Sequence, residues 1–141
     1  MGFDFSLLDS ATWQVGPDET ETDILSFDVA ASSPSAITDI DLLSMGSFSE
    51  NGTASVTEAT PAGNLFTQFA SGGITPSDSM SVIPPVGSLT VNGDISLIGG
   101  TGGASITNVS TLFSTVPEPS LTLLCLCALG LVPLARRKFI H

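Results

Sequence analysis

The sequence has almost no positive charge. Residues 1–135, from Met1 to Ala135, contain no Lys or Arg, and the three basic residues follow one another as Arg136, Arg137 and Lys138, against 14 acidic residues. Binding to nucleic acid or to an anionic lipid surface depends on positive charge. The composition therefore excludes a DNA-, RNA- or lipid-surface-binding role for the acidic part of the chain, which would attract cations instead.

Histidine and cysteine are also missing from residues 1–115. The chain has one His, the terminal His141, and two Cys, Cys125 and Cys127, which lie in the hydrophobic tail. The body therefore lacks His and Cys as well as Lys and Arg. Without them it has no Ser-His-Asp or Cys-His catalytic set, no phosphate clamp and no His or thiolate metal site. We therefore expect a non-enzymatic protein without a cofactor; a glycosidase with two catalytic carboxylates is the enzymatic alternative.

Carboxylates are the chemistry that remains in the body. Two acidic segments provide candidate calcium ligands, since Ca²⁺ prefers oxygen donors. Their residues are Asp18, Glu19, Glu21 and Asp23 in the first segment and Asp39 and Asp41 in the second. Neither segment follows a D-x-[DN]-x-[DN]-G loop pattern, and a solvated acidic loop is the alternative interpretation.

Tyrosine is absent as well, and residues 1–115 are rich in Ser, Thr, Gly, Ala and Val. Short alternating apolar runs are separated by Gly, Asn and Pro, which is typical of an antiparallel β protein. We predict that this mainly β body is a small antiparallel β-sandwich or jelly-roll-like domain. Disorder is the alternative, because high net charge with few aromatic residues is its signature, but 42% hydrophobic residues is a high content for a disordered chain.

Five segments carry the strand signals, namely residues 24–29, 36–43, 54–56, 88–98 and 104–113. In residues 88–98, Asn92-Gly93 lies between alternating apolar residues, and this dipeptide predicts a two-residue turn that folds the segment into a hairpin. The four glycines of residues 99–103 predict a loop. Ile83-Pro84-Pro85 predicts an edge strand or a connection, because proline cannot donate a hydrogen bond to a sheet.

The end of the sequence has a different character from the body. Residues 120–135 read SLTLLCLCALGLVPLA without a charge, and as a helix they would be about 24 Å long, enough to cross a membrane with some local thinning. A buried core helix is the alternative. The basic tail, residues 136–141, predicts a cytoplasmic C-terminus and a body on the outside, because basic residues beside a span stay in the cytoplasm.

A short proline-flanked strip, residues 116–120, precedes the predicted span and reads Val116-Pro117-Glu118-Pro119-Ser120. Its two prolines hold the backbone extended and stop a helix from growing outward past the span. The strip is therefore predicted to be stiff and accessible at the membrane face, which is the backbone geometry that a membrane protease needs. An ordinary linker before a tail anchor is the alternative.

In this order, the strip, the apolar helix and the basic cluster resemble the PEP-CTERM sorting signal of Gram-negative and related bacteria. The resemblance covers residues 116–138 and implies an exosortase substrate. It implies that Val116, Pro117, Glu118 and Pro119 are recognised by that membrane enzyme, and that Arg136, Arg137 and Lys138 retain the precursor in the inner membrane. Cleavage would then release the body to the cell surface or an extracellular polysaccharide matrix. A carbohydrate- or calcium-binding module delivered by the same anchor is the alternative.

The beginning of the sequence does not match this expectation. An exported protein should begin with a basic stretch and an apolar run, whereas residues 1–13 read MGFDFSLLDSATW, with acidic residues at Asp4 and Asp9. We therefore predict that the true start lies upstream of Met1.

Overall fold

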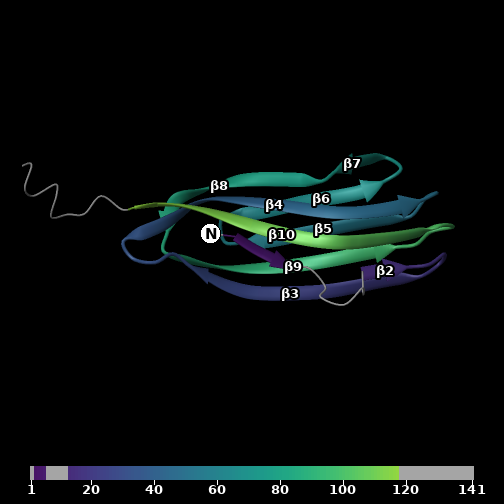
Figure 1. The fold of residues 1–141 in the computed structure, drawn as a ribbon, viewed down its shortest axis with the longest axis horizontal. Coiled ribbons are helices and arrows are strands. Elements are labelled where there is room, and N and C mark those ends of the chain that lie inside the picture. Colours follow the sequence, from purple (N-terminus) through teal and green to yellow (C-terminus); the bar gives the residue numbers. More distant parts are fainter. Residues whose placement is uncertain (1, 6–12, 118–141) are drawn as a thin grey trace, which may run out of the picture.

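The computed structural model describes the backbone of residues 2–5 and all of residues 13–117, which form two antiparallel sheets of five strands each. The β10 sheet has the order β1-β10-β4-β8, with β2 also paired to β10; its strands are β1 (Gly2–Phe5), β2 (Trp13–Val15), β4 (Ser35–Ser49), β8 (Ser77–Val86) and β10 (Gly103–Pro117). The β9 sheet has the order β3-β9-β5-β6-β7; its strands are β3 (Thr20–Ala30), β5 (Thr53–Thr60), β6 (Gly63–Ala70), β7 (Gly73–Thr75) and β9 (Ser88–Ile98). The sheets lie face to face (Figure 1), which confirms the predicted antiparallel sandwich.

Alternation of apolar and polar residues decides which side chains enter the space between the sheets. The core consists of the inward residues of both sheets and one indole from β2. Its buried members are Trp13, Val15, Val29, Ile37, Ile40, Leu42, Ala54, Val56, Leu65, Phe69, Val82, Leu89, Val91, Ile95, Leu97, Ala104, Ile106, Val109 and Phe113. Phe27 of β3 meets Phe113 of β10 edge to face, with ring centroids 6.5 Å apart, so aromatic contact also joins the two sheets.

The predicted hairpin at Asn92-Gly93 is wrong. Strand β9 passes straight through this dipeptide, pairing Asn92 with Ser26 and Gly93 with Leu25 of β3. A two-residue turn there would pair residue 91 with residue 94 and place the apolar residues before and after the turn on opposite faces. A continuous strand instead keeps the apolar residues at positions 89, 91, 95 and 97 on one buried face, and burial of all four stabilises the strand.

The other strand predictions fall within observed strands. Residues 24–29 lie in β3, residues 36–43 in β4, residues 54–56 in β5 and residues 104–113 in β10, and the predicted loop lies between β9 and β10. The Ile83-Pro84-Pro85 segment belongs to β8, the edge strand of the β10 sheet, and no pairing to β4 is described between Ser81 and Val86. The prediction that these prolines mark an edge is therefore confirmed.

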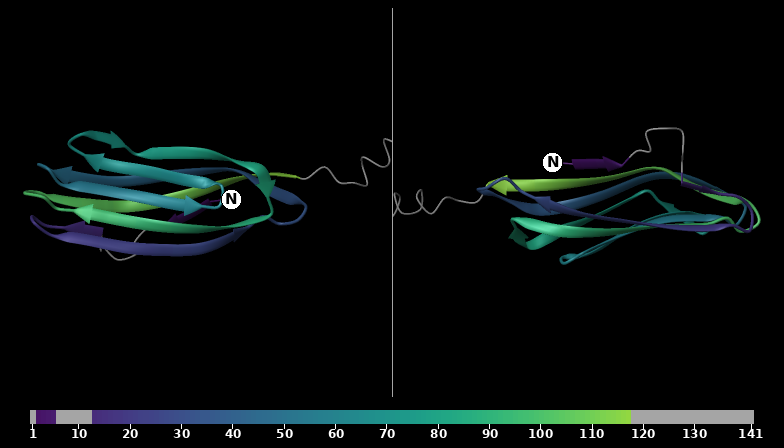
Figure 2. Two further views of the ribbon diagram at one scale, coloured as in Figure 1. Left: turned by 180° about the vertical axis from the view of Figure 1, so that it is seen from behind. Right: turned by 90° about the horizontal axis from the view of Figure 1, so that it is seen from below.

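One end of the sandwich, called here the closed end, is formed by three turns that each cross between the sheets. They are residues 16–19 between β2 and β3, residues 50–52 between β4 and β5, and residues 99–102 between β9 and β10. The turns bond to one another: Asp18 N donates to Gly100 O at 2.6 Å, and Gly99 N donates to Glu19 O at 2.8 Å. The two layers converge at this end and stand apart at the other (Figure 2).

The opposite end, called here the open end, holds the loop of residues 31–34, the turn of residues 61–62, Gly87 and the last residues of β10. Figure 1 shows the strand β10 leaving the sandwich at this end. A backbone bond of 2.8 Å from Ala31 N to Gly87 O joins two of these connections.

Candidate functional site

The first half of the predicted recognition strip is part of the β10 sheet. Val116 pairs with Ala36 and Pro117 pairs with Ser35, the first residues of β4. A register irregularity between Ser114 and Thr115 separates these last pairs from the rest of the ladder. The Val116 side chain is 48% exposed, so the start of the strip is extended and accessible on the body.

The rest of the predicted signal lies outside the described residues. This holds for Glu118 and Pro119 of the strip, for the span of residues 120–135 and for the basic residues Arg136, Arg137 and Lys138. Within the part of the chain that the structure describes, no helix is long and apolar enough to cross a membrane.

The first acidic segment is spread along the closed end and β3. The Asp18 backbone adopts a left-handed conformation with φ of 58°, and the Glu19 carboxylate accepts a hydrogen bond from Gly16 N at 2.8 Å. Glu21 lies exposed on β3, and the Asp23 carboxylate accepts a bond from the Trp13 indole at 2.7 Å. These two bonds hold the start of β3 against the turn before it and against β2.

The second acidic segment lies on the outer face of the β10 sheet. Asp39 and Asp41 are two residues apart on β4 and point to the same side, and the Asp39 carboxylate accepts a hydrogen bond from Ser81 Oγ of β8 at 3.0 Å. This segment is therefore in a different sheet from Asp18, Glu19, Glu21 and Asp23. Across residues 13–117 the structure forms no group of three or more His, Cys, Asp or Glu side chains that could hold a metal ion.

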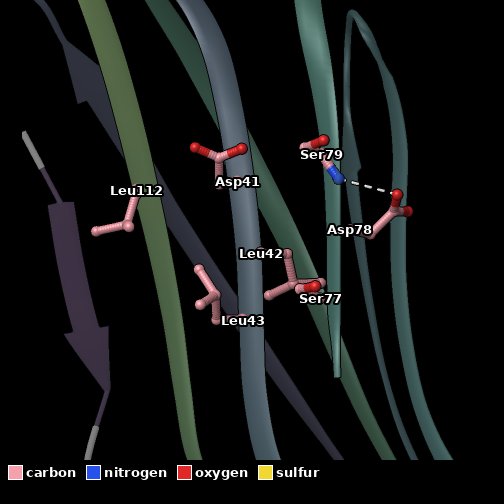
Figure 3. Close-up of a pocket in the computed structure, with 7 residues that line it drawn as sticks. All are labelled: Asp41, Leu42, Leu43, Ser77, Asp78, Ser79 and Leu112. Atoms are coloured by element: carbon pink, nitrogen blue, oxygen red, sulfur yellow. Dashed lines mark hydrogen bonds between the residues drawn. The ribbon is translucent and has the colours of Figure 1, made fainter. Parts of the chain in front are cut away.

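A shallow groove runs along this outer face beside Asp41. It has a volume of about 460 Å³ and is lined by Asp41, Leu42, Leu43, Ser77, Asp78, Ser79 and Leu112. Figure 3 shows Asp41 and Leu43 on β4, Leu112 on the neighbouring β10, and the serines on β8. The groove thus combines a carboxylate and hydroxyls with exposed leucines, a mixture that can both hydrogen-bond a ligand and cover an apolar surface.

A second, smaller groove continues along the same face. It has a volume of about 290 Å³ and is lined by Asp39, Asp41, Ser79, Met80, Ser81 and Ser114. Asp41 and Ser79 line both grooves, so together they form one polar strip across β8, β4 and β10.

Asp78 differs from these outward residues although it also lines the first groove. Its Oδ2 accepts a hydrogen bond of 2.9 Å from Phe66 N of β6, and its Oδ1 accepts one from Ser79 N, the bond drawn in Figure 3. The first bond links edge strand β8 of one sheet to β6 of the other. Asp78 therefore closes the side of the sandwich.

Two polar pairs lie buried between the sheets. Thr111 Oγ1 of β10 donates to Glu58 Oε1 of β5 at 2.6 Å, and Ser44 Oγ of β4 donates to Thr67 Oγ1 of β6 at 2.6 Å. The Glu58 side chain is 2% exposed, and its Oε2 has no hydrogen-bond partner within the described residues. Burial raises the pKa of the Glu58 carboxyl above its usual range, and the bond from Thr111 offsets part of that rise.

The sequence contained a signal for Glu58 that the strand prediction did not use. Ala54, Val56 and Glu58 occupy alternate positions of β5, so the period of two places the acid on the core face. Gly93 lies opposite Glu58 on β9. The partner Thr111 is 53 residues away in the other sheet, and no local pattern indicates it.

No protein-family model matches this chain, and no curated protein matches it. Among solved structures, the chain is similar to TmCBM61, a carbohydrate-binding module whose structure was determined in complex with β-1,4-galactotriose. The two are 11% identical, with 72% of this chain and 69% of that chain covered and a TM-score of 0.40. A likeness at this level supports no conclusion about what this chain binds.

Proposed function

We propose that this protein is an exported, non-enzymatic surface or matrix-associated protein whose β-sandwich is delivered by a C-terminal sorting signal that exosortase cleaves. In the precursor, residues 120–135 span the inner membrane, Arg136, Arg137 and Lys138 hold the tail in the cytoplasm, and the body lies outside. After cleavage the body reaches the cell surface or the extracellular matrix.

The observation that carries the proposal is the position of the strip, which begins at the end of the last strand of the described core. Strand β10 is the last described strand, it completes the β10 sheet, and it ends at Pro117, the first proline of the strip. Within residues 13–117, every buried core residue precedes the strip, the last being Phe113. The core that the structure describes is therefore built entirely from residues that precede the strip.

The test is maturation of the full-length precursor in cells that contain an exosortase. The Glu118→Ala variant should remain uncleaved and membrane-bound, whereas the wild-type chain should lose the mass of its hydrophobic and basic segments, measured by intact-protein mass spectrometry. The matched control is Glu21→Ala, which removes an exposed acid from β3 and should mature normally. Normal maturation of the Glu118→Ala chain would contradict the proposed recognition of the strip.

A carbohydrate- or calcium-binding role for the body is the second candidate, and the polar strip on the outer face of the β10 sheet favours it. Carboxylates at Asp39 and Asp41, serine hydroxyls of β8 and the leucines Leu43 and Leu112 are groups that can bond sugar hydroxyls and cover a sugar ring. Calorimetry of the detergent-solubilised full chain with acidic and neutral polysaccharides and with Ca²⁺ tests this role.

Two variants make that calorimetry specific to the strip. Asp41→Asn should abolish any heat of binding, and Asp94→Asn, which changes an exposed acid of β9 on the other sheet, should leave it intact. If neither polysaccharide nor Ca²⁺ gives heat with the wild-type chain, the binding role is wrong and the structural role stands alone.

A further inference from the structure

The two ends of the sandwich differ in charge. The closed end carries Asp18, Glu19 and Glu50 in its turns. Among the described residues, the open end carries no charged residue in residues 30–36, 60–63, 82–89 or 113–117, which cover the connections at that end and the exit of β10; Glu118 of the strip follows directly. In a chain with a net charge of −11, an end free of acids is the part of the body that an anionic surface repels least.

The open end also exposes apolar groups. Ile83 is 85% exposed and Val116 is 48% exposed. Beside Ile83 lies a hollow of about 160 Å³, lined mainly by apolar residues: Pro61, Ala62, Val82, Ile83, Pro84, Val86, Ser88 and Leu89. Pairing of Val86 with Ile37 and of Val116 with Ala36 brings this part of β8 and the end of β10 to the same end of β4.

The sequence sets how far this end can stand from the predicted span. Residues 118–119 are all that separates Pro117, the last residue of β10, from Ser120, the first of the apolar segment. Even a fully extended chain covers no more than about 3.6 Å per residue, so three steps from Pro117 to Ser120 reach roughly 11 Å. A span anchored at Ser120 therefore keeps Pro117 within roughly 11 Å of the hydrocarbon edge, close to the lipid headgroups.

We propose that the open end of the sandwich rests on the headgroup layer of the membrane in the anchored precursor, with Ile83 against the lipid and the closed end pointing away. This inference rests on the proposed membrane anchor. It is compatible with the acidic composition. The two-residue link between Pro117 and the span holds the body near the membrane, and the open end, whose connections carry no charged residue, is the end that faces the lipid.

Distance and screening explain why the orientation is fixed. Strand β10 has 15 residues, so the closed end lies about 50 Å from the membrane at roughly 3.3 Å per residue. Charges separated by more than about 10 Å of salt solution interact little, and the acids of the closed end therefore meet no repulsion. A body lying flat on either sheet would instead bring the outward acids of that sheet, Asp41 of β4 or Asp94 of β9, against anionic lipid.

The experiment places a probe at each end of the full-length chain in vesicles of phosphatidylethanolamine and phosphatidylglycerol. Cys125 and Cys127 are first changed to Ser, and a fluorophore is attached at Ile83→Cys or, in the matched control, at Ile74→Cys. Ile74 lies on β7 towards the closed end and is 61% exposed, so both probes sit at exposed isoleucines. Nitroxide carried on lipid headgroups should quench the probe at position 83 and leave the probe at position 74 bright.

Each outcome decides a different point. If the chain floats with the vesicles but both probes are quenched equally, or only the probe at position 74 is quenched, the orientation is wrong while the anchor stands. If the chain does not float with the vesicles, both the anchor and the orientation are wrong. As a second measurement, Ile83→Asp should reduce the quenching of a probe at Ala62→Cys, and Ile74→Asp should not; equal effects of the two substitutions would overturn the assignment of Ile83.

Discussion

At the closed end the three turns bond to one another, whereas at the open end the connections are short, uncharged and joined through Ala31 and Gly87. Thr101 at the closed end donates to Asn51 Oδ1 from its backbone at 2.6 Å and from its hydroxyl at 2.8 Å. The two ends therefore differ in role. The closed end holds the two sheets together, and the chain leaves the sandwich at the open end.

The largest expected difference is between two glycines. A side-chain carbon on Gly99 would lie 1.8 Å from the Gly16 carbonyl oxygen, whereas one on Gly87 would meet no atom within 4 Å. We expect Gly99→Ala to lower the free energy of unfolding by about 3 kcal/mol, because backbone must move to make room. Gly87→Ala should change it by less than about 0.5 kcal/mol. Urea denaturation measures both, and similar values would remove the distinction between the ends.

A smaller effect is expected midway between the ends. Thr111→Val keeps the shape of the side chain but leaves the buried Glu58 carboxyl without its one described hydrogen bond, and we expect a loss of about 1–3 kcal/mol. Thr90→Val, which removes a hydroxyl from the exposed face of β9, is the control and should cost less than about 0.5 kcal/mol. If Thr111→Val is harmless in urea denaturation, the closed end alone joins the sheets.

The smallest effect is a change in pH dependence. Because the pKa of Glu58 is raised in the folded protein, its contribution to stability is fully present below the pKa of the unfolded chain and is lost as pH rises through the folded value. Glu58→Gln should remove this part of the fall, so its melting temperature should gain on the wild type as pH rises above the usual titration range of a glutamate. Glu50→Gln at the closed end is the control. If the melting temperatures of Glu58→Gln and of the wild type change with pH in parallel, Glu58 is not the group that causes this loss of stability.

The sequence was sufficient to predict the sandwich because the apolar residues of its strands alternate with small polar ones. The edge position of Ile83-Pro84-Pro85 was also predictable, since a missing backbone donor is a local property. The hairpin error has a local cause too: the preference of Asn92-Gly93 for turns was given more weight than the phase of the apolar residues on either side. The alternation of the apolar residues predicts the strand correctly, because burial of a whole strand face outweighs the turn preference of one dipeptide.

The arrangement of the strands could not be predicted from local signals. Strands β4 and β5 are joined by a three-residue turn at Asn51-Gly52, yet they lie in different sheets. Alternation is the same whichever sheet a strand joins, and the choice depends on contacts between distant residues. The same limit applies to the polar pairs: the position of Glu58 on the core face was readable, but the approach of Thr111 required the two sheets to be stacked.

The irregular pairing near the end of β10 has a mechanical consequence. A pull on the chain beyond Pro117 acts on the ladder with β4 one pair at a time, starting with Pro117 and Ser35 and then Val116 and Ala36. The register irregularity between Ser114 and Thr115 separates these terminal pairs from the part of the ladder that holds the buried ring of Phe113. The described residues of β10 after Phe113 contribute no side chain to the core, so they are the part of the strand that costs least to draw out.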